Sequence, residues 1–351
     1  MNVDYIVVGC GLAGIAFTET ALQNNKSVVV FDNNSQTSSS IAAGLYNPVI
    51  LKRFSGLQDA QTQIDLLHIF YGNLQKKLKV QIDFKIPILR KFFSVEEQNN
   101  WFIASDKIDL APFLSLDLIT KKYNGIDSEF GYGQVLQTGY VDTYLLLQFY
   151  RNYLSKNEMY FEESFDYSKI QFFNTHIQYK NITSINIIFA EGFGIHSNPF
   201  FNNLPLDGTK GELLIIKAPK LKIDVVMNTS VFILPLGKDL FKIGATYNWS
   251  DKTNYPTDEG KLELIERIKE ILNCDFEIIS HFAGVRPTVK DRKALIGTHF
   301  RHQNLHILNG LGTRGVMLAP TMAKKLFEYI EYQKEIDLSI DIKRFYKKMD
   351  L

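Results

Sequence analysis

The sequence predicts a protein of two domains, an α/β nucleotide-binding domain and a β-rich second domain. The segment up to Asp32 reads as a strand, a glycine turn, a helix and a second strand, which is the usual start of a doubly wound parallel sheet. From residue 208 the pattern changes to short strands and a hairpin. At 351 residues the chain is also longer than a typical single domain.

Two strands, at residues 5–8 and 27–31, and a helix at 12–24 are predicted in this first segment. Both strands are short, apolar and rich in Val, and neither alternates polar with apolar residues. This composition is typical of parallel strands that are covered on both faces.

The glycine turn carries the pattern G-x-G-x-x-G at Gly9, Gly11 and Gly14. Gly9 allows the tight turn, Gly11 lets the backbone approach a pyrophosphate, and Gly14 lets the helix pack closely on the strand. The helix N-terminus offers free N–H groups to the phosphates, and Asp32 ends the second strand where a carboxylate accepts hydrogen bonds from a ribose. The alternative interpretation is a glycine-rich turn in an α/β domain that binds no ligand. Such a turn would not require an acid at the position of Asp32. The segment therefore predicts dinucleotide binding.

Composition narrows the class of protein. The 39 basic and 38 acidic residues nearly balance, so there is no general electrostatic case for a nucleic-acid or membrane partner. Cys10 and Cys274 suggest neither a disulfide framework nor a metal site. The first strand leaves no room for a signal peptide, and no apolar run is long enough to span a bilayer. We therefore expect a cytoplasmic protein without a membrane span.

After Asp32, a polar loop at residues 33–40 continues into residues 41–53, which are rich in small side chains. Because this loop follows the ribose-binding acid, we expect it to contact the cofactor, although a plain surface loop is the alternative. Apolar residues at steps of three and four predict a helix at residues 55–79.

Residues 81–132 mix strand-like and irregular segments and are interpreted as the first piece of the second domain. Residues 133–154 lead into an amphipathic helix. A buried strand within residues 186–194 is followed by Gly192 and Gly194. A glycine turn at the carboxyl end of a strand is the kind of place where the backbone contacts a ligand.

The β-rich part begins with a strand at 208–219 and a hairpin at 230–249, followed by a helix at 256–273. A strand at 305–309 then leads into a second glycine turn that opens a helix. Binding of a phosphate or a ring carbonyl by backbone N–H groups is therefore expected to recur near the end of the chain.

Several motifs, read in order, resemble the D-amino-acid-oxidase-like flavoprotein superfamily, especially its glycine oxidase branch. They are also similar to the flavin module of the enzyme that matures the wobble methylaminomethyl-uridine of tRNA. GCGLAG (9–14) would fit many families, whereas AGVRP (283–287) followed by GLGTRGVMLAP (310–320) is more specific. The resemblance implies a GR2-type Rossmann-like FAD-binding domain at residues 1–79, 136–206 and 280–351. A discontinuous antiparallel-sheet substrate domain is implied at residues 80–135 and 207–279.

The resemblance also implies FAD as cofactor, bound without a covalent link. Leu12 and Ala13 would then lie at the pyrophosphate and Asp32 at the adenosine ribose, while residues 38–45 would run along the flavin. Residues 312–317 would direct N–H groups at the N1–C2=O edge, which becomes anionic on reduction. The implied cofactor-binding residues are Gly9, Gly11, Leu12, Ala13, Gly14, Asp32, Asn33, Ser38, Ser39, Ser40, Ala43, Gly44, Leu45, Gly192, Gly312, Thr313, Arg314, Gly315, Val316 and Met317.

The chemistry implied is oxidation of a C–N bond by hydride transfer to flavin N5, for which the protein mainly orients the substrate. Arg286 matches the family's carboxylate-binding arginine; an arginine that fixes a strand end through an ion pair is the structural alternative. Glycine oxidase has a Tyr where this chain has Phe232, and Tyr247 is expected to face the same pocket. Arg314 is interpreted as a residue that binds substrate or cofactor, or that caps a loop. Lys52 and Arg53 either add positive charge near flavin N5 or the substrate, or belong to a solvated loop.

Three functions follow from these observations. The first is an FAD-dependent oxidase or dehydrogenase of an amino acid or secondary amine that carries a carboxylate, with oxygen or an unknown carrier as electron acceptor. The second is a tRNA-modifying flavoenzyme that acts on a carboxymethylamino group, although the chain lacks the basic excess expected for tRNA. The third is a flavin-binding redox protein without turnover.

Overall fold

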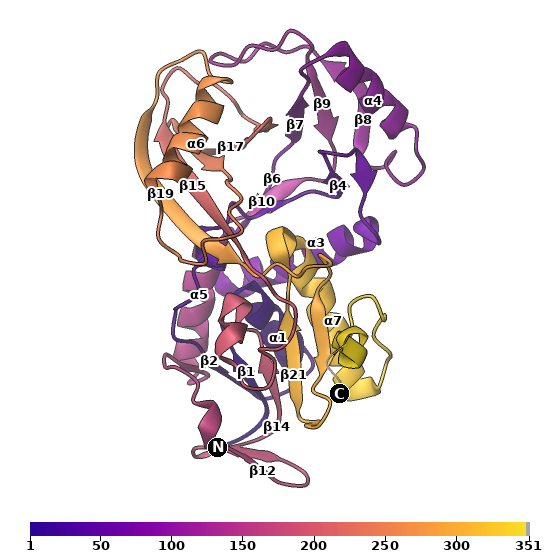
Figure 1. Cartoon of the computed structure of the whole chain (residues 1–351), viewed down its shortest axis with the longest axis vertical. Helices are drawn as coiled ribbons and strands as arrows, with labels where there is room; N and C mark the ends of the chain where they lie inside the picture. The colour runs from indigo at the N-terminus through magenta and orange to yellow at the C-terminus, as the bar shows by residue number, and fades with distance from the viewer. Residues whose placement is uncertain (349–351) are drawn as a thin grey trace.

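The structure is a computed structural model and describes residues 1–348. It is built around two large sheets, one in the lower half and one in the upper half of Figure 1. The predicted end of the FAD-binding domain, at residue 351, lies outside the described residues.

The lower sheet has a parallel centre, as predicted for a Rossmann-like domain. Strands β11, β2, β1 and β14 lie side by side and run parallel, and β21 adds a further parallel strand beside the end of β14. Strand β20 pairs antiparallel with β21, and β13 and β12 extend antiparallel from the start of β14. In chain order these strands are β1 (Asn2–Val8), β2 (Val28–Phe31), β11 (Tyr160–Phe161), β12 (Ile170–Phe172), β13 (Ile177–Tyr179), β14 (Ile182–Phe189), β20 (Leu295–Thr298) and β21 (Leu305–Asn309).

Side chains of β1 alternate between two buried layers, because successive residues of a strand point to opposite faces. Tyr5 and Val7 pack into the core that contains the helices, whereas Ile6 and Val8 pack into a second, aromatic-rich core. The helices of the first core are α1 (Leu12–Gln23), α3 (Ala60–Leu78), α5 (Thr143–Lys156) and α7 (Gly315–Tyr332). Both faces of the parallel strands are therefore covered, as their composition predicts.

The upper sheet runs in the order β19, β15, β18, β17, β16, β7, β9, β8. Neighbours are antiparallel except β16 and β7, which pair in parallel and join the two chain segments that build the sheet. The strands are β7 (Ile88–Lys91), β8 (Leu114–Ile119), β9 (Tyr132–Val135), β15 (Thr209–Lys217), β16 (Val226–Asn228), β17 (Phe232–Gly237), β18 (Leu240–Gly244) and β19 (Glu277–Arg286). Strand β19 runs across the predicted boundary at residues 279–280, and the exact domain limits remain a prediction.

Shorter elements complete the fold. The helices are α2 (Ser38–Ile41), α4 (Val95–Ser105) and α6 (Asp258–Lys269), and the 3-10 turns are η1 (Tyr167–Lys169), η2 (Gly192–Ser197), η3 (Gly312–Arg314) and η4 (Ile342–Lys348). Strands β3 (Leu45–Tyr46), β10 (Gly139–Val141) and β6 (Asp83–Lys85) form a small sheet, and β4 (Val49–Ile50) pairs with β5 (Ser55–Gly56).

The helix predicted at residues 55–79 is wrong at its start, since α3 begins at Ala60. Ser55 and Gly56 pair with Val49 and Ile50 instead, and Asp59 adopts a left-handed conformation with φ 56° that helix residues do not adopt. Within residues 1–348, every helix is too short or too polar to cross a bilayer.

Candidate functional site

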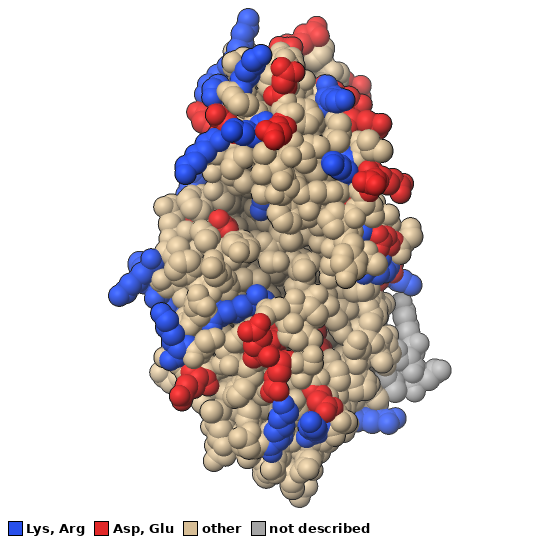
Figure 2. All heavy atoms as spheres, turned by 90° about the vertical axis from the view of Figure 1, so that its left-hand side faces the viewer, with Lys and Arg blue, Asp and Glu red and all other residues tan. Residues whose placement is uncertain are grey.

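A cavity of about 710 Å³ lies where the carboxyl ends of the parallel strands meet the upper sheet. Figure 2 shows one face of the molecule, hollowed between its two halves and surrounded by interspersed acidic and basic side chains. The cavity is within the size range of small-molecule sites, and the carboxyl edge of a parallel sheet is where such ligands bind.

The first glycine turn forms part of the cavity wall. Gly9 has φ +100°, and a side chain there would meet the carbonyl oxygen of Ala190 at 2.5 Å. A Cβ on Gly14 would lie 1.8 Å from the carbonyl oxygen of Gly9, so α1 packs against the turn as closely as predicted. The backbone N–H of Leu12 donates to the Ser39 hydroxyl at 3.3 Å, which joins the turn to α2. These glycines let β1, the turn and α1 pack closely, and the start of α1 at Leu12 and Ala13 lines the cavity.

Asp32 lines the same cavity at the end of β2. Its carboxylate accepts a hydrogen bond from Arg151 on α5 at 2.8 Å. Burial, the largest single effect, lowers the pKa of Arg151, but the charge of Asp32 together with Cys10 and Tyr160 more than offsets it and the net shift is upward. The Arg151 Nε atom is buried without a protein partner, so the pair retains capacity for a ligand oxygen.

The second glycine turn meets the first. A Cβ on Gly315, the first residue of α7, would lie 3.1 Å from Leu12 Cδ1, so the starts of α1 and α7 are adjacent. The N–H of Gly312 donates to the carbonyl of Pro287 at 3.1 Å, which ties this turn to the end of β19. Two helix N-termini with partial positive charge therefore face one cavity.

These residues fit FAD. The backbone of Gly9, Gly11 and Leu12 forms the cavity wall at the start of α1, the acid at the end of β2 suits a ribose, and the start of α7 offers N–H groups to an electron-rich ring edge.

Arg286 lies in the roof of the cavity, at the end of β19. Its Nη1 donates to the Thr246 carbonyl at 3.3 Å, and its guanidinium carbon lies 4.6 Å from the centre of the Tyr247 ring. Burial lowers the pKa of Arg286, and within residues 1–348 no carboxylate forms an ion pair with it. Space for the guanidinium comes from Gly211, where a Cβ would lie 1.8 Å from Nη2. A half-buried cation without a protein counter-charge is suited to an anionic ligand.

The structure brings most of the expected site residues to this cavity. Those that line it are Gly9, Gly11, Leu12, Ala13, Asp32, Asn33, Ser38, Ser39, Ala43, Gly44, Leu45, Gly192, Gly312, Thr313, Gly315, Val316, Tyr247 and Arg286.

Ser40, Arg314 and Met317 do not line the cavity, contrary to expectation; Gly14 lies just behind the first turn, in the packing position predicted for it. The Ser40 hydroxyl donates a hydrogen bond to the Thr37 carbonyl. Met317 lies in the first turn of α7 and its side chain is buried in the core. Burial and the nearby charge of Arg292 lower the pKa of Arg314, which stands at the N-cap position of α7 without a side-chain capping hydrogen bond. Lys52 and Arg53 are exposed and also lie outside the lining.

Sequence reasoning missed three charged residues at or beside the site. Arg151 reads as an ordinary polar position of an amphipathic helix, so no local signal marks it. Burial raises the pKa of Glu191 to about 7, against hydrogen bonds from Asn198 and Tyr167 that lower it. Lys242 donates to the carbonyl of Ala42 at 3.1 Å, and burial lowers its pKa. Lys242 could have been identified from the sequence, because it is an isolated lysine in an otherwise apolar strand.

Comparisons with known proteins agree with this arrangement. The family described as "DAO: FAD dependent oxidoreductase" matches residues 4–329. The chain is 28% identical over 116 residues to the bifunctional tRNA 5-methylaminomethyl-2-thiouridine biosynthesis protein MnmC of Campylobacter jejuni subsp. doylei, a match that spans 32% of this chain and 19% of that protein.

Two solved structures share the fold over nearly the whole chain. Glycine oxidase from Bacillus cereus superposes with a TM-score of 0.74 at 19% identity, covering 95% of this chain and 96% of that one. Iminodiacetate oxidase from Chelativorans sp. gives a TM-score of 0.76 at 16% identity, covering 96% of this chain and 99% of that one.

Proposed function

Because the chain belongs to the DAO family of FAD-dependent oxidoreductases, we propose that it oxidises the C–N bond of an amino acid or secondary amine that carries a carboxylate. The observation that carries this proposal is Arg286, a half-buried guanidinium that lines the cofactor cavity and has no acidic partner among the described residues. A planar guanidinium binds a carboxylate through two parallel hydrogen bonds and so fixes its orientation as well as its position.

The proposed cofactor contacts follow from the cavity lining. The N–H groups at the start of α1 would bind the diphosphate, Asp32 with Arg151 would bind the ribose, and the turn before α7 would bind the pyrimidine edge of the flavin. Bound FAD supplies the two-electron acceptor, which takes up a hydride at N5.

The chain's own residues would bind and orient the substrate. Arg286 would hold the carboxylate, while Leu213 and Phe232 form an apolar wall that limits water beside the reacting carbon. The acidic residues that line the cavity are Asp32, Glu163 and Glu191, and all three belong to the nucleotide-binding part. Among the described residues, none in the roof offers a carboxylate to hold an ammonium, so we propose that the amine reacts in its neutral form.

Anaerobic reduction of the flavin by a panel of amino acids and N-alkyl glycines tests this proposal. At least one carboxylated amine is expected to bleach the flavin, with dithionite as the control for complete reduction. If dithionite bleaches it and no amine does, amine oxidation is the wrong class, and a flavin-binding protein without turnover takes its place.

A second candidate is a tRNA-modifying flavoenzyme that acts on a carboxymethylamino group. The sequence match to the tRNA-modifying protein supports it, although that match spans only 19% of the relative's length. Deletion of the gene would then remove a modified uridine from tRNA, and the purified protein would retain RNA. Unchanged tRNA nucleosides after deletion would exclude this candidate.

A further inference from the structure

A buried polar cluster lies on the face of β15 that points away from the cavity. Gly211 and Leu213 of β15 line the cavity, so Lys210 and Glu212, which alternate with them, point to the opposite face. The side chain of Lys210 is 0% exposed and that of Glu212 is 3% exposed. Burial of two charged groups is costly unless partners satisfy them, so their partners indicate what the cluster holds in place.

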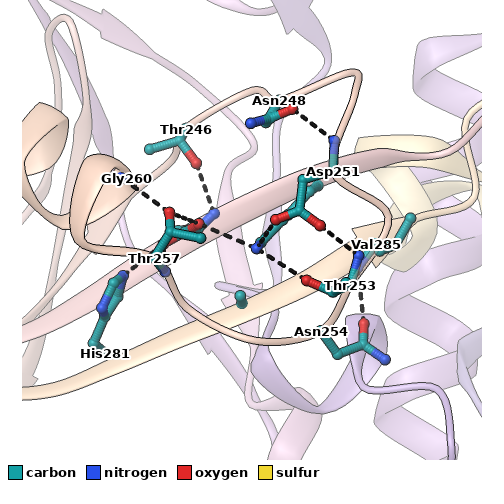
Figure 3. Close-up of polar contacts among 12 residues, drawn as sticks. Thr246, Asn248, Asp251, Thr253, Asn254, Thr257, Gly260, His281 and Val285 are labelled. Carbon is teal, nitrogen blue, oxygen red and sulfur yellow. Dashed lines mark hydrogen bonds and ion pairs between the residues drawn. The ribbon is translucent and has the colours of Figure 1, made fainter.

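The Lys210 ammonium lies 3.5 Å from the Glu212 carboxylate on the same strand, and its other side-chain partners belong to one loop, residues 245–257, which joins β18 to α6. The Lys210 ammonium forms an ion pair with Asp251 and donates to the Thr253 hydroxyl at 3.3 Å. The backbones of Lys210 and Asn248 exchange hydrogen bonds of 2.9 and 3.0 Å. Figure 3 shows Asn248, Asp251 and Thr253 gathered on this loop beside β15. The Lys210 side chain therefore fastens the middle of the loop to the sheet.

Glu212 holds the two ends of the same loop. Its carboxylate accepts hydrogen bonds from the Thr257 N–H and hydroxyl, at 3.0 and 2.8 Å, and lies 2.8 Å from His281 Nε2. Its backbone N–H donates to the Thr246 hydroxyl at 2.9 Å.

The loop in turn contacts the substrate-binding part of the cavity. The Thr246 carbonyl accepts a hydrogen bond from Arg286, and the Tyr247 ring covers the guanidinium. Asn254 accepts a hydrogen bond from the N–H of Val285, the residue before Arg286, at 3.2 Å. The position of the guanidinium thus depends on where the loop lies.

Apolar packing does not hold this loop. Its three large aromatic side chains, Tyr247, Trp249 and Tyr255, are 60%, 49% and 77% exposed. Polar contacts to β15 and β19 therefore carry the anchoring.

We propose that Lys210 is a positioning residue for Arg286. It acts through Asp251 and the loop 245–257, which it holds in the conformation that presents the Thr246 carbonyl and the Tyr247 ring to the guanidinium. This inference rests on the proposed carboxylate-binding role of Arg286 and extends it to a residue outside the cavity. A purely structural Lys210 would change the stability of the fold and leave carboxylate binding unchanged.

The test compares Lys210→Met and Asp251→Asn with a matched control, Asp207→Asn. Asp207 forms an exposed ion pair with Lys252 of the same loop at 3.3 Å, so its removal should not release the loop. Asp251 is 26% exposed, so Asp251→Asn is expected to fold even if Lys210→Met does not. Each FAD-loaded variant is titrated with glycolate, a carboxylate without an amine, while flavin absorbance is followed.

Both anchor variants should bind glycolate roughly tenfold more weakly than wild type, the size of effect typical of residues that act through a neighbour. Asp207→Asn should bind it normally, and all three variants should keep FAD. Wild-type glycolate affinity in Asp251→Asn would overturn the proposal, as would a loss that is matched by Asp207→Asn.

Tryptophan fluorescence provides a readout that needs no ligand. The chain has two tryptophans, the fully buried Trp101 and Trp249 on the loop. Acrylamide should quench Trp249 more strongly in both anchor variants, with Trp249→Phe used to subtract the emission of Trp101. Unchanged quenching would show that the pair does not hold the loop and would overturn the inference. If wild type and Arg286→Ala bind glycolate equally, the carboxylate-binding role fails instead, while quenching still reports on the anchor.

Discussion

Replacing Arg286 with Ala should remove carboxylate recognition and leave the cofactor in place. A carboxylate held by both guanidinium nitrogens makes two charge-assisted bonds of about 1.5–3 kcal/mol each. Even the lower value gives a loss of about 3 kcal/mol, which corresponds to a rise in KM of roughly 10²-fold. The starts of α1 and α7 and the Asp32–Arg151 pair, which we assign to FAD, do not involve Arg286.

The assay compares a carboxylated amine with its amide, for example glycine with glycinamide or the corresponding pair for the substrate that the panel identifies. The KM of the carboxylated member should rise and that of the amide should not, with FAD content unchanged. Arg286→Lys should give an intermediate rise, because a lysine keeps the charge but not the planar fork. An unchanged KM for the carboxylated amine, or an equal rise for both members, would refute the assignment.

Three further predictions concern single residues. Gly211→Ala would place a Cβ 1.8 Å from Arg286 Nη2, so the guanidinium must move and the KM of the carboxylated amine should rise; steady-state kinetics at a wild-type KM would contradict this. Asp32→Asn removes the charge opposite Arg151 and should weaken FAD binding by roughly tenfold, measured by titrating apoprotein with FAD. Burial raises the pKa of Glu191 from 4.5 to about 7, so the folded state binds a proton more tightly than the unfolded state does. The free energy of unfolding should therefore fall as pH rises from 4.5 to 7, by at most about 3 kcal/mol, and Glu191→Gln should remove this slope in urea titrations. Identical pH slopes of the free energy of unfolding in wild type and Glu191→Gln would contradict the raised pKa of Glu191.

Local rules were enough to predict the nucleotide-binding edge of the fold. The glycine spacing, the apolar strands and the acid at Asp32 follow from backbone geometry within one short segment, and the structure reproduces all of them. The start of α4 was missed although its signal was present. Ser94 accepts a hydrogen bond from the N–H of Glu97 at 3.1 Å, which is one half of a capping box that the sequence displays.

The residues that could not be predicted depend on contacts between distant segments. Arg151 reaches the site because α5 packs beside β2, and its own helix gives no hint of Asp32. Ser55 and Gly56 leave the helical pattern because they pair with a strand, which outweighs the apolar spacing that follows. Arg314 has the sequence position of a ligand contact, but only its neighbours Thr313 and Gly315 line the cavity.

The adjacency of Leu12 and Gly315 has a consequence for biosynthesis. The wall of the pocket at Leu12 is translated first, whereas the wall at Gly315 leaves the ribosome only after most of the chain has been made. A nascent polypeptide that ends before Gly315 would expose its early glycine corner without the helix that closes it. We therefore expect flavin to be captured late, after the distal helix has emerged, so that arrested chains shorter than this would remain colourless.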